Sequence, residues 1–358
     1  MPTPLQCLLC ADNVVLNMSI QIDEAIATAQ AGNDLSADDV QALLGTMLLG
    51  QANDQRIGEL LLALRAKGES VSELVGAARA MRQHMTPIKS QGGVLLDTCG
   101  TGGDGSGTFN ISTAAAIVTA ATGIRVAKHG NRAITSNSGS ADVLSALGVK
   151  IDTDRDVVER CLEQAGICFC FAPRLHPAMR HVGSIRRQLE VPTLFNLLGP
   201  LCNPAAATHQ VLGTGQASTQ RKLAEALHQL GTEHAVVVRG HDGLDEVTLN
   251  GLTSVIEVTG EGCRETEWSP ASFGLDPSGP ETMLADGPDQ SAAIIRAVLD
   301  GQPGPARDIV IANAAASIWL CDADDNLITA AQRAADAIDS GQARRTLETL
   351  SEITTSAQ

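Results

Sequence analysis

Two polar turns, each lying between an apolar run and a predicted helix, constrain this chain more than any other feature. The first follows Val94-Leu95-Leu96 and reads Gly100-Thr101-Gly102-Gly103-Asp104-Gly105, after which Asn110-Ile111-Ser112-Thr113 opens an Ala-rich run to Ala121. This order predicts a strand, a loop and a helix. Glycines without a Cβ let the backbone approach an anion, and the free N–H groups and dipole of the following helix favour negative charge. We therefore expect a phosphate group at this turn.

A second turn of the same kind follows the next predicted strand, residues 123–127. This strand runs into Lys128 and His129, and the residues after it carry hydroxyl groups, namely Thr135, Ser136, Ser138 and Ser140. The first turn also fits the dinucleotide-binding fingerprint, but that motif requires an acidic residue where this strand ends in cationic ones. Turn glycines and helix caps without a ligand are the remaining alternative. Two successive turns with one pattern favour two phosphate groups.

The order of the predicted elements indicates an α/β fold class with a small N-terminal helical domain. The sequence predicts helices at 141–147, 154–165 and 219–230, strands at 167–171 and 235–238, and further helices at 290–343 with a break at 301–305. Such alternation is typical of a mostly parallel central sheet, whose ligands lie at the carboxyl ends of the strands. Residues 36–84 predict three helices whose apolar stripes indicate core or subunit contacts.

The domain boundaries follow from this pattern. We expect a tail at 1–17, which is a candidate for disorder, and a helical domain at 18–88 that is joined by about 177–205. Residues 89–176 and 206–358 then make up the larger α/β domain. Thr86-Pro87 ends the helical part, because the residue before a proline is disfavoured in a helix.

A pair of adjacent acidic residues, Asp245 and Glu246, follows the apolar strand 235–238. Adjacent carboxylates repel each other unless a cation compensates them, and hard oxygen ligands beside a pyrophosphate suit Mg²⁺. The alternative is a solvated acidic turn before a hairpin at Asn250-Gly251. His129 and His241 are candidates for general bases, but a lone loop histidine is more often a hydrogen-bonding residue, so neither is given a chemical role.

Two adjacent arginines, Arg186 and Arg187, lie in a segment from His176 to Pro200 that interrupts the alternation of strands and helices. A guanidinium group suits a planar carboxylate, because its fork donates two parallel hydrogen bonds. From residue type alone, a solvated charge on a helix is the better interpretation of either arginine.

Charge and composition exclude several function classes. A net charge of −16 and an aromatic content of 2% leave no basic surface or stacking platform for nucleic acid. No apolar run reaches the roughly 18 residues of a membrane span. Nine irregularly spaced cysteines indicate a reducing, cytoplasmic location. Cys7 and Cys10 lack the partners of a zinc site, and ordinary free thiols are the better interpretation.

Four stretches of the chain together resemble the successive motifs of anthranilate phosphoribosyltransferases. They are GTGGDGSGTFNIST, KHGNRAITSNSGSADVLSALG, HPAMRHVGSIRRQLEVPTLFNLLGPLCNP and GHDGLDEVTLNG, and the similarity extends from about Ser36 to Ala343. Pyrimidine-nucleoside phosphorylases of the same superfamily share a Lys-His-Gly-Asn-Arg stretch, but Asp245-Glu246 and the FNLLGP segment disfavour them. The acidic net charge disfavours a non-catalytic nucleic-acid-binding relative.

The resemblance implies transfer of the 5-phosphoribosyl group from phosphoribosyl pyrophosphate to anthranilate in tryptophan biosynthesis, by a homodimer formed through the helical domain. It implies two Mg²⁺ ions held by Ser112, Asp245 and Glu246, and it places anthranilate at Gly100, Asn131 and Arg186, with Arg187 structural. The chain departs from the family at Asn137, where lysine is common. Around phosphoribosyl pyrophosphate the resemblance places Gly100, Gly103, Asp104, Thr108, Asn110, Ile111, Ser112, Thr113, Lys128, His129, Gly130, Asn131, Arg132, Ala133, Ile134, Thr135, Ser136 and Ser140.

Overall fold

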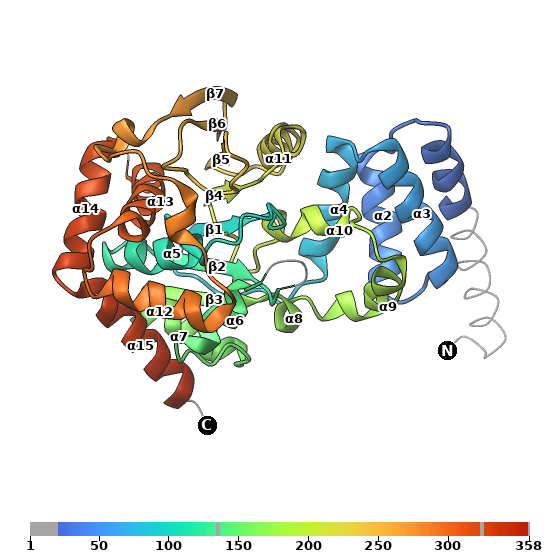
Figure 1. Ribbon diagram of the computed structural model, residues 1–358. Coiled ribbons are helices and arrows are strands. Elements are labelled where there is room, and N and C mark those ends of the chain that lie inside the picture. The colour runs from blue at the N-terminus through green and yellow to red at the C-terminus, as the bar shows by residue number, and fades with distance from the viewer. Residues whose placement is uncertain (1–20, 134–136, 323–325, 357–358) are drawn as a thin grey trace. The chain divides into compact units, whose positions relative to one another are not determined.

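The chain forms two compact units (Figure 1). The computed structural model describes residues 21–133, 137–322 and 326–356. The first unit combines the chain up to Thr86 with His176–Cys202, and the second combines Pro87–Leu175 with the chain from Asn203 onwards. The first unit is helical and the second holds a seven-stranded sheet with helices, so the expected fold class is confirmed. The predicted tail with Cys7 and Cys10 lies outside the described residues.

Two separate stretches of chain supply the helices of the first unit. Residues 21–30 are helical, which the sequence patterns did not reveal. After them come α2 (Ala37–Leu48), α3 (Asp54–Lys67) and α4 (Val71–Gln83). The later stretch adds η1 (Pro177–Met179), α9 (Arg180–Leu189), α10 (Phe195–Leu198) and η2 (Gly199–Leu201). The apolar stripes of α2 to α4 are buried in this unit.

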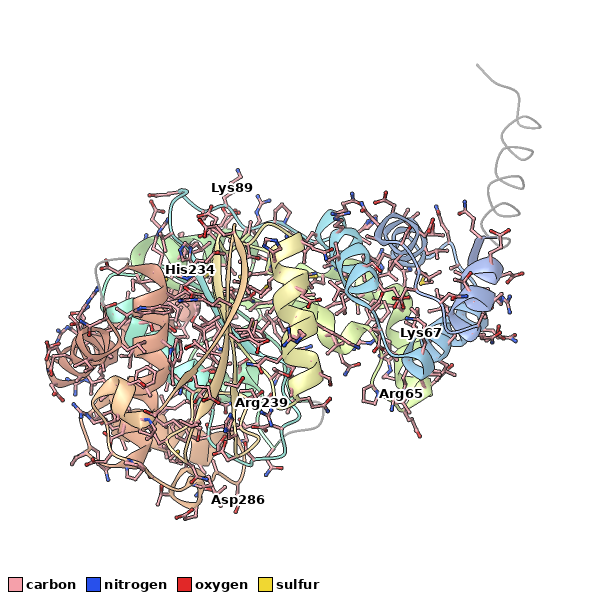
Figure 2. The ribbon with its side chains drawn as sticks, turned by 90° about the horizontal axis from the view of Figure 1, so that it is seen from above. Arg65, Lys67, Lys89, His234, Arg239 and Asp286 are labelled. Atoms are coloured by element: carbon pink, nitrogen blue, oxygen red, sulfur yellow. The ribbon has the colours of Figure 1, made fainter. Side chains whose placement is uncertain are left out.

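Polar residues before each helix begin the bundle helices as the sequence indicates. The side chain of Ser70 accepts from the N–H of Glu73, and the Glu73 carboxylate accepts from the N–H of Ser70, which completes a capping box. The carboxylate of Glu73 is fully buried and also lies 3.0 Å from the ammonium of Lys67. Figure 2 labels Lys67 among the helices of this unit. Where α9 crosses α3, a Cβ at Gly58 would lie only 3.2 Å from the side chain of Ile185. The two stretches of chain therefore share one closely packed core.

The second unit is built on one mixed sheet. Its strands are β1 (Leu96–Gly100), β2 (Val126–Gly130), β3 (Ile167–Phe171), β4 (His209–Gly213), β5 (His234–Gly240), β6 (Thr253–Thr259) and β7 (Gly262–Trp268). They lie in the order β3-β2-β1-β4-β5-β6-β7, with the first five parallel and the last two antiparallel. The parallel part carries the apolar strands, as expected for strands covered by helices.

Helices cover the sheet on both faces (Figure 1). On one face lie α5 (Ile111–Ala121) and α13 (Pro305–Cys321), which contact each other and the central strands, while α11 (Ala217–Gln229) packs against β5, β6 and β7 on the other. Nearly every residue of α5 and most of α13 is buried, as is typical of a helix that is apolar all round. α13 follows the predicted break at 301–305, so this part of the helical expectation is confirmed.

Shorter and peripheral helices complete the unit. They are α6 (Ser140–Ala146), α7 (Arg155–Gln164), α8 (Ala172–Leu175), η3 (Pro270–Phe273), η4 (Pro280–Met283), α12 (Pro288–Leu299), α14 (Leu327–Asp339) and α15 (Gln342–Ser356). Within the described residues we find no helix with the length and hydropathy that a membrane span requires.

Two predicted elements differ from the structure. The first strand was expected over the apolar run that starts at Val94, but it begins at Leu96, because the two preceding residues form the connection that leads into the sheet. The predicted hairpin at Asn250-Gly251 is wrong, because a wider connection joins β5 to β6. At its base His241 N donates to Leu252 O. Within it Thr248 Oγ1 donates to Asp242 Oδ2. The tight hairpin lies instead between β6 and β7, which the sequence patterns did not reveal.

Candidate active site

The acidic loop that follows β5 lies across the carboxyl ends of β1 and β4. These two strands flank the switch point of the sheet, since the chain continues from β1 to β2 and β3 on one side and from β4 to β5 on the other. Neither strand end has room for a side chain. A Cβ at Gly213 would overlap the carbonyl oxygen of Asp245, and one at Gly100 would lie 2.7 Å from its carboxylate. Glycine at both positions lets Asp245 sit directly on this edge of the sheet.

Three carboxyl groups meet at this edge. Asp245 Oδ2 accepts a hydrogen bond from Gly102 N (3.1 Å), Asp104 Oδ2 from Asp245 N (3.3 Å), and Glu246 Oε1 from Ser112 N (3.0 Å). Burial, with a further contribution from the Asp104 charge, raises the pKa of Asp245 to about 7. Burial and the Asp245 charge raise the pKa of Glu246 to about 8. The acidic pair is therefore half-buried, with negative charge that the local donors do not fully compensate.

The donor set at this edge fits Mg²⁺. Asp245, Glu246 and the hydroxyl group of Ser112 supply the hard oxygens that the sequence predicted, and Asp104 adds a further carboxylate. Among the described residues, no group of three or more His, Cys, Asp or Glu side chains forms a metal site by itself. Mg²⁺ commonly takes one or two carboxylates and completes its shell with water and substrate phosphate. These residues therefore suit a cation that binds together with a phosphate.

Lys128 lies inside β2 and not at an exposed strand tip. The strand covers Val126–Gly130 and keeps its parallel pairing with β3 throughout. The Lys128 side chain is buried, and its ammonium group donates to Thr98 O (2.5 Å) and Ser112 Oγ (3.3 Å). Burial lowers the pKa of Lys128, against the opposing effect of nearby carboxylates, first that of Asp97. The expected cationic strand tip is therefore wrong, and the charge lies beneath the amino end of α5.

Asn110 joins the two polar turns. Its Nδ2 donates to Ser138 O (3.1 Å), and its Oδ1 accepts from Ser138 Oγ (2.8 Å) and from Ser291 Oγ (2.9 Å). Its backbone N–H donates to Ser291 Oγ (3.0 Å). Both lone pairs of the amide oxygen are thus used within the protein, and one Nδ2 hydrogen remains. The structure brings the two predicted turns together through this residue.

The second turn is closed by Asp142 at the start of α6. The carboxylate of Asp142 accepts from Ala133 N (2.8 Å), Gly139 N (3.1 Å) and Arg132 Nη1 (2.8 Å). Burial opposes ionisation of Asp142, but these donors outweigh it and lower its pKa. Asn131 lies at the open side, where its carbonyl oxygen accepts from Ser140 Oγ (3.5 Å). The predicted Ile134, Thr135 and Ser136 lie outside the described residues.

Several predicted site residues direct their side chains into the core. Ile111, Thr113 and His129 are buried, and the backbone N–H of His129 donates to Asp97 Oδ1. Gly103 is in the left-handed region at φ 76°, which suits a residue without a Cβ. The hydroxyl of Thr108 lies 3.1 Å from that of Ser106 within the first turn, and a Cβ at Gly130 would overlap Ser140 Oγ.

Arg186 and Arg187 differ clearly in their surroundings. Both lie in the last turn of α9, in the helical unit. The guanidinium of Arg186 lies over the ring of Phe195, 5.1 Å from its centroid, and burial lowers its pKa. Among the described residues, no ion pair with a carboxylate compensates Arg186. Arg187 is exposed. The cation–π contact holds the guanidinium of Arg186 in one place.

Three residues of this site were not predicted from the sequence. Asp97 is fully buried and accepts from His129 N (3.0 Å), and Asn203 donates through Nδ2 to Ala127 O (2.7 Å). Ser291 supports Asn110 from α12. Asp97 alone left a signal in the sequence, since an acidic residue within an apolar strand requires a compensating partner.

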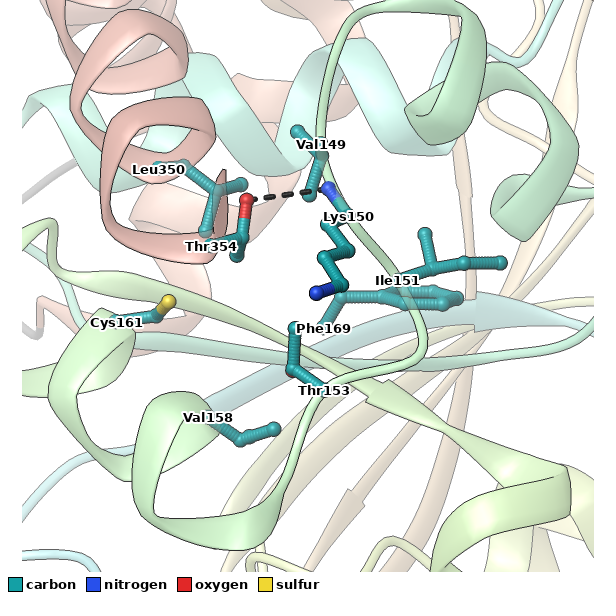
Figure 3. Close-up of a pocket in the computed structure, with 9 residues that line it drawn as sticks. All are labelled: Val149, Lys150, Ile151, Thr153, Val158, Cys161, Phe169, Leu350 and Thr354. Atoms are coloured by element: carbon teal, nitrogen blue, oxygen red, sulfur yellow. Dashed lines mark hydrogen bonds between the residues drawn. The ribbon is translucent and has the colours of Figure 1, made fainter. Parts of the chain in front are cut away.

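A small hollow elsewhere in the α/β unit contains none of the predicted site residues. Figure 3 shows Lys150, Phe169, Cys161 and Thr354 around it, with the N–H of Lys150 donating to Thr354 Oγ1 (3.1 Å). The space suits about one water molecule and not a substrate. It is therefore a packing feature between α15 and the loop before α7.

Two family models match the chain. One is described as "Glycosyl transferase family, helical bundle domain" and matches residues 23–85, and the other as "Glycosyl transferase family, a/b domain" and matches residues 92–344. The anthranilate phosphoribosyltransferase of Rhodopirellula baltica is 56% identical to this chain, over 93% of this chain and 98% of its own length. That of Herpetosiphon aurantiacus is 46% identical, over 93% and 99%.

Solved structures show the same similarity. The anthranilate phosphoribosyltransferase of Thermus thermophilus superposes with a TM-score of 0.86 and 39% identity, over 92% of this chain and 99% of its own. The Saccharomyces cerevisiae enzyme in complex with PRPP and Mg superposes with a TM-score of 0.85 and 30% identity, over 96% and 98%. The yeast enzyme has also been solved with 4-fluoroanthranilate, with a TM-score of 0.84.

Proposed function

This chain belongs to the anthranilate phosphoribosyltransferase family, and from this membership we infer its activity. It transfers the 5-phosphoribosyl group of phosphoribosyl pyrophosphate to anthranilate and releases pyrophosphate, a step of tryptophan biosynthesis. The observation that best supports this in the structure is the switch-point edge of the sheet, where two Gly-containing turns, a buried lysine and a half-buried acidic pair meet.

We propose that the two turns bind phosphoribosyl pyrophosphate. The N–H groups at the start of α5 and the ammonium of Lys128 beneath them provide positive potential for the phosphate groups. In the second turn, the residues from Gly130 to Ala133 offer backbone groups held in place by Asp142. The remaining contacts are those given by the family resemblance, with Ile111, Thr113 and His129 acting through their backbones.

We propose that Asp245, Glu246 and Ser112 hold Mg²⁺, as two ions. These residues would hold the cation beside the pyrophosphate, where it would supply positive charge to neutralise the leaving group. These carboxylates favour this binding, because a cation compensates negative charges whose burial, together with repulsion between neighbouring carboxylates, raises the pKa of both groups. The proposal rests on magnesium in the related yeast complex and on the donor chemistry here.

We propose that Arg186 binds the carboxylate of anthranilate, with Gly100 and Asn131 as further contacts. The guanidinium of Arg186 lies over Phe195 and forms no ion pair with a carboxylate among the described residues. Its N–H donors are therefore available for the carboxylate of a planar acid. Arg187 is exposed and is proposed to be structural. Once the acid is held, its amine needs only to be oriented toward the ribose carbon, so positioning accounts for much of the rate enhancement.

The transfer passes through an oxocarbenium-like state with positive charge on the ribose. The carboxylates around this edge and the cationic groups at the phosphates stabilise the separated charges without a change of geometry. No side chain is assigned as a general base, because His129 is buried in β2 and His241 lies beside Glu267. Electrostatics and positioning therefore carry the proposed mechanism.

The test uses the fluorescence of anthranilate. We expect its loss when phosphoribosyl pyrophosphate and Mg²⁺ are added together, and no loss when either is omitted. A nucleoside with inorganic phosphate is the control for the phosphorylase alternative. Release of uracil or thymine, with anthranilate unchanged, would contradict the assignment.

We propose that the two units are the helical and α/β domains of the enzyme. We also propose that the helical unit forms a homodimer. Leu49 and Leu62 supply exposed apolar surface for this contact, at 54% and 43% exposure. Light scattering on the purified protein tests the dimer. A cytoplasmic location is proposed from the irregularly spaced cysteines.

A further inference from the structure

The carboxyl halves of β1 and β2 are not joined by an ordinary strand ladder. β1 pairs with β4, and β2 with β3, along the whole strand, but β1 and β2 share only the pair Leu96↔Val126. In a continued parallel ladder, the backbone groups of Thr98 and His129 would bond across this gap. Both groups bond to side chains instead.

These side chains form a reciprocal clasp between the two strands. Asp97 of β1 accepts from the backbone N–H of His129 in β2 (3.0 Å), and Lys128 of β2 donates to the backbone carbonyl of Thr98 in β1 (2.5 Å). Each strand thus contributes a charged side chain that forms a hydrogen bond with the backbone of the other strand. The clasp fixes the end of β2, from which the second turn leaves the sheet after Gly130.

The clasp also brings two buried charged side chains to neighbouring positions of β1 and β2. Asp97 is 0% exposed and Lys128 is 3% exposed. The remaining oxygen of Asp97 lies 3.5 Å from Gln210 Nε2, which is a weak contact for a buried carboxylate. The ammonium of Lys128 lies on the carbonyl of Thr98, the residue that follows Asp97 in β1. A buried carboxylate at this place is costly unless it compensates that cation.

We propose that Asp97 is a positioning residue for phosphoribosyl pyrophosphate. It fixes the backbone of the second turn through His129 and supplies the counter-charge that holds the Lys128 ammonium beneath α5. Because Asp97 compensates Lys128, the carboxylates of Asp245 and Glu246 are left for the cation. This inference rests on the proposed role of Lys128 in binding that substrate.

Asp97→Asn is the first test, because it keeps the shape and the acceptor for His129 N–H but removes the charge. We expect the Kd for phosphoribosyl pyrophosphate, measured by titration calorimetry with Mg²⁺, to rise about tenfold, while the KM for anthranilate changes less than about twofold. In a Lys128→Met background the same substitution is expected to change that Kd less than about twofold, since no ammonium is left to position.

Stability provides a second readout that does not depend on activity. Each single variant leaves one buried charge alone and is expected to lower Tm, whereas Asp97→Asn with Lys128→Met removes both and is expected to recover part of that loss. If Asp97→Asn does not fold, recovery of folding in the double variant supports the pairing and its absence overturns it. Glu73→Gln, which removes the buried partner of Lys67 in the helical unit, is the matched control and is expected to lower Tm without changing the Kd.

Two binding results separate this inference from the proposed function. If Lys128→Met weakens the substrate but Asp97→Asn does not, the positioning role is overturned and the role of Lys128 stands. If Lys128→Met binds the substrate normally, the role of Lys128 is wrong and the inference falls with it. Equal losses from Asp97→Asn with and without Lys128 would also overturn the positioning role.

Discussion

The half-buried acidic pair predicts that the metal-free protein becomes more stable when Asp245 is replaced by Asn. The folded protein raises the pKa of Asp245 from 3.8 to about 7, so the fold favours the protonated form. The folded state then binds more protons than the unfolded state, and the destabilisation is absent below pH 4, grows between pH 4 and 7, and is complete above pH 7.

The magnitude follows from the size of the shift. About three pKa units at about 1.36 kcal/mol each give roughly 4 kcal/mol for an isolated group. Asp245 and Glu246 repel each other, so removing one charge also relieves the other, and the effects are not additive. We therefore expect Asp245→Asn to gain about 2 to 4 kcal/mol above pH 7 and almost nothing at pH 4. Asn retains an oxygen for Gly102 N–H and adds a donor toward Asp104.

Tryptophan fluorescence is a suitable assay, because both tryptophans of the chain, Trp268 and Trp319, lie together in the α/β unit with ring centroids 5.5 Å apart. Unfolding in urea with a chelator is measured at pH 4.5 and pH 8 for the wild type and the variant. A variant that loses stability at pH 8, or gains equally at both pH values, would refute the reasoning. The same variant should require more Mg²⁺ for activity or lose it.

Three further predictions use other parts of the structure. Arg186→Ala should raise the KM for anthranilate about tenfold or more and keep the Kd for phosphoribosyl pyrophosphate within a few-fold of the wild-type value. Arg187→Ala should change neither constant. If steady-state kinetics show that the two variants behave alike, the assignment is contradicted. Glu257→Gln should lower stability above its ordinary pKa of 4.5 and progressively lose this effect as the pH falls further, in urea unfolding, because Arg264 and His234 outweigh burial and lower the pKa of Glu257. A loss that does not change with pH would refute this. Gly213→Ala should displace the acidic loop and abolish Mg²⁺-dependent activity at a stability cost of about 3 kcal/mol or more, while Gly260→Ala, with nothing within 4 Å, is the control.

The sequence patterns predicted the parts of the fold that depend on local periodicity. Four of the five parallel strands and α5 were expected, because apolar runs and polar helix starts determine them locally, whereas β4 was missed. The antiparallel strands β6 and β7 were also missed. The middle of the edge strand β7 is charged and exposed, so it lacks the apolar alternation of a half-buried strand.

The site was predicted where a motif lies within one turn and missed where distant segments meet. Ser291 supports Asn110 from far along the chain, which no local pattern indicates. The burial of Lys128 was also not predicted, since its charge suggested a strand end while its pairing with β3 holds it within the sheet. Side chains that replace backbone bonds between strands, as Asp97 does, become visible only in three dimensions.

The helical unit is discontinuous in the chain, and this affects the order in which it can form. α2, α3 and α4 leave the ribosome first, but α9, whose Ile185 packs on Gly58, follows only after Pro87–Leu175 has been made. At typical synthesis rates this delay is roughly five to twenty seconds. During that time the surface of α3 that receives α9 stays uncovered, while β1, β2 and β3 are already available to pair. The helical unit therefore begins first in synthesis but cannot be completed until three strands of its neighbour exist.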